Sequence, residues 1–141
     1  MRLSTKSRYG MRILAQIAID CQNSPSIKGR TIAKRQEISE PYLEQIMIPL
    51  KNSGFVRTIR GCNGGYALNA KPKDITTLAV IEMFEGEIDF VHCSDCERKE
   101  FCETCNVWRR LSVVFKEEAA KITLADIIKD IQSKNRPEYM I

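Results

Sequence analysis

The sequence predicts a mainly α-helical protein with one small β-hairpin. Apolar residues recur with helical spacing through most of the first third of the chain, and the pattern then changes to short runs around a glycine-rich reversal. A long helical stretch with an apolar stripe begins near residue 107. In this order, the elements predict a winged helix-turn-helix followed by a long dimerisation helix.

Three helices are predicted before the reversal. The first can be capped by Ser4 or Thr5 and ends near Cys21, which falls on its apolar face. After a loop and a short second helix, Ser39 can cap a third helix that tolerates a proline in its first turn. Pro49 should kink this third helix or end its regular part.

A β-hairpin is predicted next. Residues 55–60 and 66–68 have strand character, and a glycine-rich segment separates them. Within it, Asn63-Gly64 can adopt the positive φ angles that a tight reversal needs. Two short helices followed by this hairpin predict that residues 1–72 are a winged helix-turn-helix that binds DNA.

Residues 73–106 are predicted to hold a connecting helix and a cysteine-rich loop. The helix opens at Thr76 or Thr77 and stops at Gly86. Residues 89–105 are charged, rich in cysteine and without clear periodicity, which predicts a loop.

Residues 107–141 are predicted to form the dimerisation element. A long helix from about Val107 carries the apolar stripe, and Thr123 can cap a last helix before a tail from Ser133 that we expect to be frayed. A single helix cannot bury such a stripe alone, so we expect it to pack against its symmetry mate in a homodimer.

The charge is divided between the two halves of the chain. Residues 1–72 carry twelve Lys and Arg against four Asp and Glu, a net charge of +8, whereas residues 73–141 carry ten against fourteen, a net charge of −4. A basic half favours nucleic acid, because neutralised phosphates release counterions, although a solvated basic face has the same composition. No apolar run suits a secretory signal or a membrane span, so we expect a cytoplasmic protein without a membrane partner.

The strongest local signal is four cysteines spaced C-x2-C-x5-C-x2-C, namely Cys93, Cys96, Cys102 and Cys105. In a reducing compartment, six cysteines in a short chain indicate metal or redox chemistry rather than structural disulfides. The five-residue gap is tight for wrapping a zinc ion and suits an iron–sulfur cluster, whose irons spread the sulfurs further apart. Zinc and a loop without metal remain the alternatives.

Three separated motifs resemble the Rrf2 family. They are residues 2–10, 38–45 and 60–66, with the sequences RLSTKSRYG, ISEPYLEQ and RGCNGGY. The resemblance spans residues 1–131 and implies a homodimeric winged-helix repressor or dual regulator, of which we expect a repressor. The two-fold symmetry of such a dimer predicts a pseudo-palindromic double-stranded DNA operator. We expect no small-molecule substrate, and a single histidine without a nucleophile–base pair predicts no enzyme.

The resemblance to IscR-like members of this family implies how the cysteines act. Cys96 and Cys102 match the last two family cysteines, and Cys105 falls where those members have a histidine ligand. Phe90 occupies the place of the first family cysteine, for which Cys93 is the substitute. An all-cysteine iron–sulfur site is therefore implied, and we expect a 2Fe–2S rather than a 4Fe–4S cluster.

Other branches of the family fit less well. NsrR-like members recruit an acidic residue where this chain has Arg8, and CymR-like members lack the cysteines. The expected function is DNA-binding regulation that senses cluster, iron or redox status. The alternatives are a zinc-stabilised regulator without cluster sensing, a CymR-like regulator of sulfur metabolism, and a redox protein that uses the same cysteines.

Seven residues are candidates for DNA contact. Glu44 and Gln45 follow the first turn of the expected recognition helix, where Gln can pair with adenine and Glu can accept a hydrogen bond from cytosine. Arg60 in the wing can enter a narrowed minor groove. The candidates for phosphate contact are Lys6, Arg8, Tyr9 and Tyr42, although Tyr42 has packing as an equal interpretation. No role is assigned to Cys62 or His92.

Overall fold

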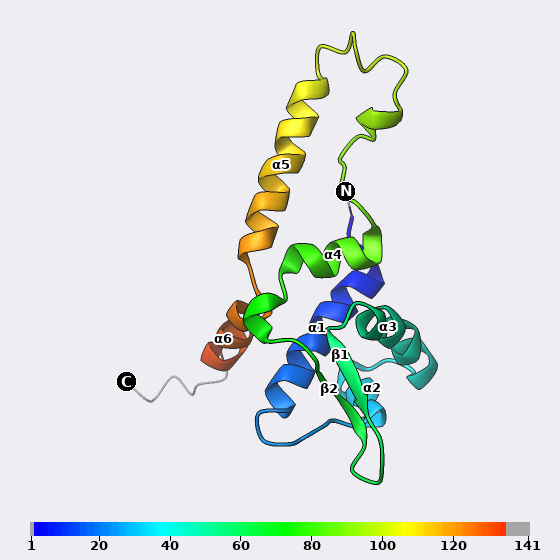
Figure 1. The fold of residues 1–141 in the computed structure, drawn as a ribbon, viewed down its shortest axis with the longest axis vertical. Helices are drawn as coiled ribbons and strands as arrows, with labels where there is room; N and C mark the ends of the chain where they lie inside the picture. The colour runs from blue at the N-terminus through cyan, green and yellow to red at the C-terminus, as the bar shows by residue number, and fades with distance from the viewer. Residues whose placement is uncertain (1, 135–141) are drawn as a thin grey trace.

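The computed structural model describes residues 2–134, which form six α-helices and one β-hairpin (Figure 1). The helices are α1 (Thr5–Asp20), α2 (Gly29–Gln36), α3 (Glu40–Asn52), α4 (Thr77–Glu85), α5 (Cys105–Lys121) and α6 (Leu124–Lys134). The hairpin consists of β1 (Val56–Ile59) and β2 (Gly65–Leu68), and single turns of 3-10 helix lie at Pro72–Asp74 and Cys93–Asp95. The predicted fold class, a winged helix-turn-helix with a long additional helix, is confirmed.

Figure 1 shows a compact body from which α5 projects as an arm. The body contains α1, α2, α3 and the hairpin, and α4 lies across it before the chain leaves along the cysteine loop. The loop ends at the far tip of α5, and α5 then returns the chain to the body, where α6 packs. Within residues 2–134, no helix is long and apolar enough to cross a membrane.

Side-chain caps start the helices where the sequence predicts them. The Ser4 hydroxyl accepts a hydrogen bond from Ser7 N at 3.2 Å, the Ser39 hydroxyl from Tyr42 N at 3.2 Å, and the Thr76 hydroxyl from Ala79 N at 3.1 Å. These bonds satisfy amides that have no partner within their own helix. At the start of α6, Thr123 and Asp126 bond reciprocally in the manner of a capping box.

Of the two outcomes predicted at Pro49, an end of the helix is wrong, and the long helix starts slightly earlier than predicted. Pro49 does not end α3, which continues to Asn52, and the amide of Ser53 still donates to the Pro49 carbonyl at 3.0 Å. Proline removes one amide donor from the helix, and the surrounding core residues Ile46, Met47 and Leu50 keep the segment in place. The long helix α5 begins at Cys105, two residues before the predicted start, so one candidate ligand belongs to the helix.

The wing reverses differently from the prediction. The positive φ lies at Gly61, with a value of 109°, and neither Asn63 nor Gly64 has one. Gly64 is instead required by close approach, since a Cβ there would lie 2.4 Å from the Ile59 carbonyl oxygen. The strands pair in register from Val56 with Leu68 to Ile59 with Gly65.

One hydrophobic core joins both ends of the chain. Side chains of α1, α2 and α3 pack there with Ile75 and with Val80 of α4, and Leu124 and Ile128 of α6 complete it. The backbone around α6 is also paired, because the Thr77 amide donates to the Ile122 carbonyl and the Leu124 amide to the Ile75 carbonyl, both at 2.8 Å. The segment after α5 is thereby fixed to the DNA-binding half of the chain.

Glu85 at the end of α4 fastens the start of α1. Its carboxylate accepts hydrogen bonds from the Ser7 hydroxyl and, at 2.8 Å, from the Ser4 amide, and these donors lower the pKa of the Glu85 carboxyl. A lowered folded-state pKa gives stability that is present above the pKa of the unfolded state, about 4.3, and is lost as the pH falls through the folded-state value.

We therefore expect Glu85→Gln to flatten the acid side of a plot of unfolding free energy against pH. The group is exposed, so the effect at neutral pH should stay below about 1 kcal/mol. Urea titrations at a series of acidic pH values measure it. An unchanged acid slope in the variant would show that the Ser4 and Ser7 bonds contribute nothing to stability.

Candidate nucleic-acid interface and metal centre

The expected reading residues lie on exposed parts of the helix-turn-helix and wing. Glu44 and Gln45 are exposed on α3, and Arg60 is exposed at the end of β1, in the loop of the wing. Leu43, Ile46, Met47 and Leu50 on the same helix are buried, so the core fixes which face of α3 is turned outward. The outward face leaves polar side chains free to reach base edges.

A hydrogen bond that the sequence does not reveal joins α3 to the wing. The Tyr66 hydroxyl of β2 donates to Glu44 Oε1 at 2.8 Å. Burial, followed by the Glu44 carboxylate, raises the pKa of Tyr66 to about 12, so the hydroxyl keeps its proton. One of the two carboxylate oxygens of Glu44, the candidate residue for cytosine recognition, therefore already accepts a hydrogen bond within the protein.

The N-terminal end of α1 brings together the candidates for phosphate contact. Lys6 and Arg8 are exposed there, and Tyr9 is half-buried. The ring of Tyr9 meets the ring of Tyr42 edge-on, with centroids 6.1 Å apart, so Tyr42 has a packing contact on this surface. The Arg12 guanidinium lies 5.1 Å from the Tyr9 centroid, which adds a cation to the same surface.

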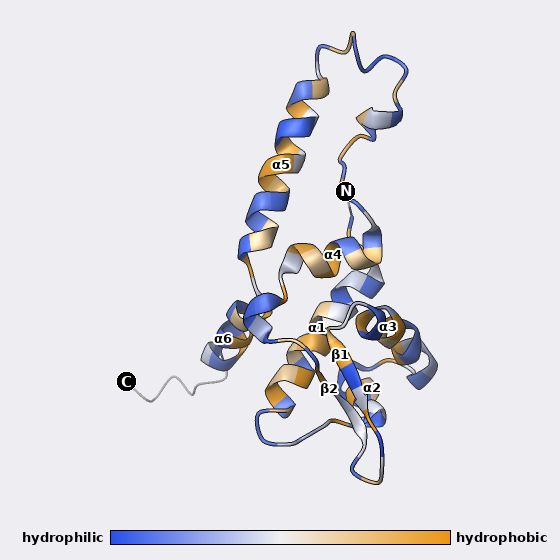
Figure 2. Ribbon diagram, in the orientation of Figure 1, coloured by the Kyte–Doolittle hydropathy of each residue, from blue (hydrophilic) through white to orange (hydrophobic). Residues whose placement is uncertain are grey.

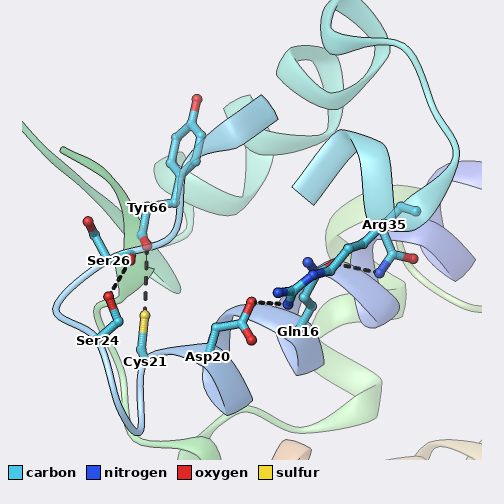
Figure 3. A network of polar contacts seen from close by, with 8 residues as sticks. Gln16, Asp20, Cys21, Ser24, Ser26, Arg35 and Tyr66 are labelled. Carbon is cyan, nitrogen blue, oxygen red and sulfur yellow. Dashed lines mark hydrogen bonds and ion pairs between the residues drawn. The ribbon is translucent and has the colours of Figure 1, made fainter. Parts of the chain in front are cut away.

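Polar contacts fix α1 against the helix-turn-helix (Figure 3). Arg35 of α2 pairs with Asp20 at 2.6 Å, and the Gln36 amide donates to the Gln16 side chain at 2.6 Å. On the other side of α1, the Cys21 thiol donates to the Tyr66 carbonyl at 3.8 Å, and burial raises its pKa. The hairpin and α2 are thus held by the same helix whose first turn carries the phosphate candidates.

The four loop cysteines differ in environment. Cys105 is buried in the first turn of α5, Cys93 is half-buried, and Cys96 and Cys102 are exposed. Over the described range, no group of three or more His, Cys, Asp or Glu side chains is arranged so that it could hold a metal ion. Cys93 lines a cavity of about 480 Å³ between the loop and α5.

Two of the other thiols lie close enough to Cys93 to affect its pKa. The pKa of Cys93 is raised by desolvation, by the adjacent Cys105 thiol and by the nearby Asp89 and Cys102. The pKa of Cys102 is lowered, chiefly by the Thr104 hydroxyl, which lies 3.4 Å from its sulfur. Thiols are the donors that soft metal ions and iron–sulfur clusters use.

Arg109 and Phe90 attach the loop to α5. The Arg109 guanidinium, one turn along α5, donates to Cys105 Sγ at 3.7 Å. The Phe90 ring packs edge-on against Phe115 at 5.8 Å between centroids, and its amide donates to the Ser112 hydroxyl at 3.4 Å. Phe90 therefore anchors the loop at the position where the resembling family members have a cysteine.

An apolar stripe on α5 is exposed. Val107, Leu111 and Val114 recur at helical spacing, and between 49% and 61% of each side chain is exposed. Figure 2 shows the corresponding hydrophobic bands along the arm. The opposite face of the helix is buried through Cys105, Ser112 and Ala119.

Comparison with known proteins connects this arrangement to a family. Residues 3–130 match the family described as "Rrf2: Iron-dependent Transcriptional regulator". The chain belongs to the Rrf2 family. It is accordingly a DNA-binding transcriptional regulator and not an enzyme.

Individual Rrf2 relatives cover nearly the whole chain. The HTH-type transcriptional regulator CymR of Bacillus subtilis is 37% identical over 127 residues, 90% of this chain and 89% of the relative. IscR of Vibrio atlanticus is 35% identical over 133 residues, 92% of this chain and 76% of the relative. Among solved structures, T. potens IscR superimposes with a TM-score of 0.80 at 33% identity, over 98% of this chain and 93% of that one.

The expected contact of the wing arginine, Arg60, with DNA can be tested by substitution. We expect Arg60→Ala to weaken DNA binding roughly tenfold. The slope of log affinity against log salt concentration should become less steep by about one for each wing that loses its arginine. Fluorescence anisotropy with duplex DNA over a salt series measures both quantities. Arg57→Ala on the neighbouring strand is the matched control, and equal effects of both variants would contradict a specific role for Arg60.

Proposed function

We propose that this Rrf2 protein is a homodimeric regulator whose DNA affinity depends on a 2Fe–2S cluster held by Cys93, Cys96, Cys102 and Cys105. The observation that carries the proposal is that the Cys93 thiol lies beside the Cys105 thiol, in the first turn of α5, with Cys102 nearby on the same loop. Those thiols supply anionic sulfur donors, and Cys96 on the same loop supplies the fourth. A bound cluster would add a redox-active group that is sensitive to iron supply and oxygen.

The conformation of the cysteine loop can change with the group that its thiols bind. Most side chains between residues 91 and 104 are exposed, so packing contributes little to the order of this segment. Arg109 would neutralise part of the negative charge of the bound thiolates through its contact with Cys105. The segment's conformation therefore depends strongly on whether the sulfurs are engaged.

A short covalent and hydrogen-bonded route connects the loop to the DNA-binding surface. The loop leaves the end of α4, where Glu85 binds the first turn of α1. That turn carries Lys6 and Arg8, the phosphate candidates. A coupling of about 1–3 kcal/mol along this route, or 5- to 150-fold in DNA affinity, is sufficient for regulation.

The stripe on α5 supports the homodimer. Exposed Val107, Leu111 and Val114 are stabilised when a second copy of the helix covers them. In that arrangement residues 1–72 bind DNA, and residues 73–106 hold the cluster that senses the signal. Residues 107–141 contain the dimerisation helix and the C-terminal helix. Two-fold symmetry would place two α3 helices about 34 Å apart, facing a pseudo-palindromic operator.

Comparison of Cys102→Ala with the cluster-loaded wild type tests the proposal. Both proteins, prepared without oxygen, are titrated at matched salt with duplex DNA selected by the wild type from a random library. We expect the affinities to differ at least fivefold, and Cys62→Ala, which removes an exposed thiol outside the loop, to behave as wild type. Identical affinities for loaded wild type and Cys102→Ala would contradict cluster-dependent binding.

Two further functions are separable by metal analysis. The 37% identity to CymR, which a solved structure describes as a global cysteine regulator, favours regulation of sulfur metabolism as the second candidate. That candidate requires no iron at the loop. A zinc-stabilised regulator is the third, and it would contain zinc in colourless protein and bind DNA independently of oxygen.

A further inference from the structure

We propose that Tyr66 is a positioning residue for base recognition, because its hydroxyl holds the Glu44 carboxylate in the orientation from which the second oxygen can reach a base. The proposal deepens the proposed function and rests on DNA reading by α3. It does not depend on the cluster. The supporting geometry is the 2.8 Å hydrogen bond between β2 and α3.

Tyr66 is held rigidly at its main chain. It pairs with Thr58 across the hairpin, and on its other side it exchanges two hydrogen bonds with Ile27, at 2.8 and 2.9 Å. Its carbonyl also accepts from the Cys21 thiol, and in Figure 3 the ring extends away from that contact. The residue is therefore fixed between three segments of the chain.

The ring of Tyr66 is enclosed as well. Only 9% of the residue is exposed. Gly29 at the start of α2 leaves room for the ring, since a Cβ there would lie 3.2 Å from Tyr66 Cε2. Lys51 of α3 lies on the ring, with its ammonium 5.9 Å from the centroid. The hydroxyl consequently occupies a defined position beside α3.

Glu44 has no comparable packing. Its side chain is exposed, and an exposed glutamate samples several rotamers unless a partner selects one. The Tyr66 hydroxyl selects one rotamer and uses one carboxylate oxygen, and the other oxygen keeps its acceptor capacity. Ordering the acceptor before DNA arrives reduces the entropy lost on binding.

A Glu44 carboxylate held in one orientation also discriminates between bases. It accepts a hydrogen bond from the amino group of cytosine, whereas the carbonyl oxygens of guanine and thymine present a second acceptor to it. A mobile carboxylate would turn toward water and lose this selectivity. Tyr66 should thus act on sequence preference and leave phosphate contacts, and hence binding to mixed-sequence DNA, unchanged.

The test is selection of duplex DNA from a random library by the full-length protein, followed by titration of the selected sites. The variants are Tyr66→Phe, Glu44→Gln and the double variant, with Thr58→Val as a control that removes one hydroxyl from the same hairpin. We expect Tyr66→Phe to lower base preference roughly five- to tenfold at the positions that Glu44→Gln also affects. The double variant should lose no more than Glu44→Gln alone, and Thr58→Val should match the wild type.

A second variant keeps the proposal testable if Tyr66→Phe unfolds. Glu44→Asp shortens the side chain by one methylene and breaks the contact without altering the wing, so it should give the same loss of preference. If Glu44→Gln changes the base preference but Tyr66→Phe and Glu44→Asp leave it unchanged, the role of Tyr66 is overturned and DNA reading by α3 still stands. Failure of the wild type to select any sequence overturns DNA reading by α3, and the role of Tyr66 with it.

Discussion

Replacing Val114 with Asp should dissociate the proposed homodimer and abolish operator binding. Val114 is the most exposed residue of the α5 stripe, with 61% of its surface accessible. A carboxylate at the centre of an apolar interface has to be desolvated without a partner, which costs at least about 2 kcal/mol per copy. With two copies in the interface, we expect the dissociation constant to rise more than about 100-fold.

Sedimentation equilibrium measures the dissociation, and DNA titration measures its consequence. Val113→Asp is the matched control, because Val113 is similarly exposed, at 48%, on the same helix but outside the stripe. A monomer is left with one half-site contact, so tight operator binding should be lost with the dimer. A dimeric, fully active Val114→Asp protein would contradict the proposed interface.

Replacing Gly65 with Ala should detach the wing and destabilise the protein by about 1–3 kcal/mol, as overpacking does. A Cβ at this position would lie 2.2 Å from the Ile27 carbonyl oxygen and 2.6 Å from its carbon. These are backbone atoms, which cannot rotate away as a side chain does. The strand beside Tyr66 would have to separate from Ile27, and Arg60 and the Glu44 contact would lose their support.

Thermal or urea unfolding measures the loss of stability, and DNA titration measures the loss of binding. Asn63→Ala in the same wing is the control, since Asn63 is exposed and accepts the hydrogen bond of the Ser26 hydroxyl at its main-chain carbonyl, which alanine retains. Stability of Gly65→Ala equal to that of Asn63→Ala would show that the hairpin can be displaced at no cost.

The elements that sequence predicts well are those set by local physics. Caps at Ser4, Ser39 and Thr76 act within three residues, and the apolar period of each helix is visible along the chain. The family motifs and the cysteine spacing likewise lie in continuous segments. Local signals are weaker where tertiary packing competes, as at Pro49, where the core keeps a helix that proline alone would interrupt.

The contacts that organise the candidate site are not visible in the sequence because they join distant residues. Tyr66 is 22 residues from Glu44, and Glu85 is 81 residues from Ser4. Nothing in the periodicity of either segment specifies such a partner. Arg109 is the exception, since a cation one helical turn after Cys105 could have been identified once α5 was known to begin there.

The cysteine loop could also be predicted only in part from the sequence. Spacing identifies four thiols with suitable chemistry, but the positions of their sulfurs depend on a segment with few buried side chains. Residues that anchor the loop, such as Phe90 against Phe115, explain where it begins. The arrangement of the thiols in the loaded protein depends on the group that they bind.

Iron and acid-labile sulfide analysis of protein purified without oxygen, with a visible spectrum of the same sample, tests the central claim most directly. The proposal predicts coloured protein with about two irons and two sulfides per chain, and loss of both in Cys102→Ala. Protein that stays colourless and free of iron, even after incubation with ferrous iron, sulfide and a thiol reductant, would contradict it and leave a DNA-binding regulator that responds to some other signal.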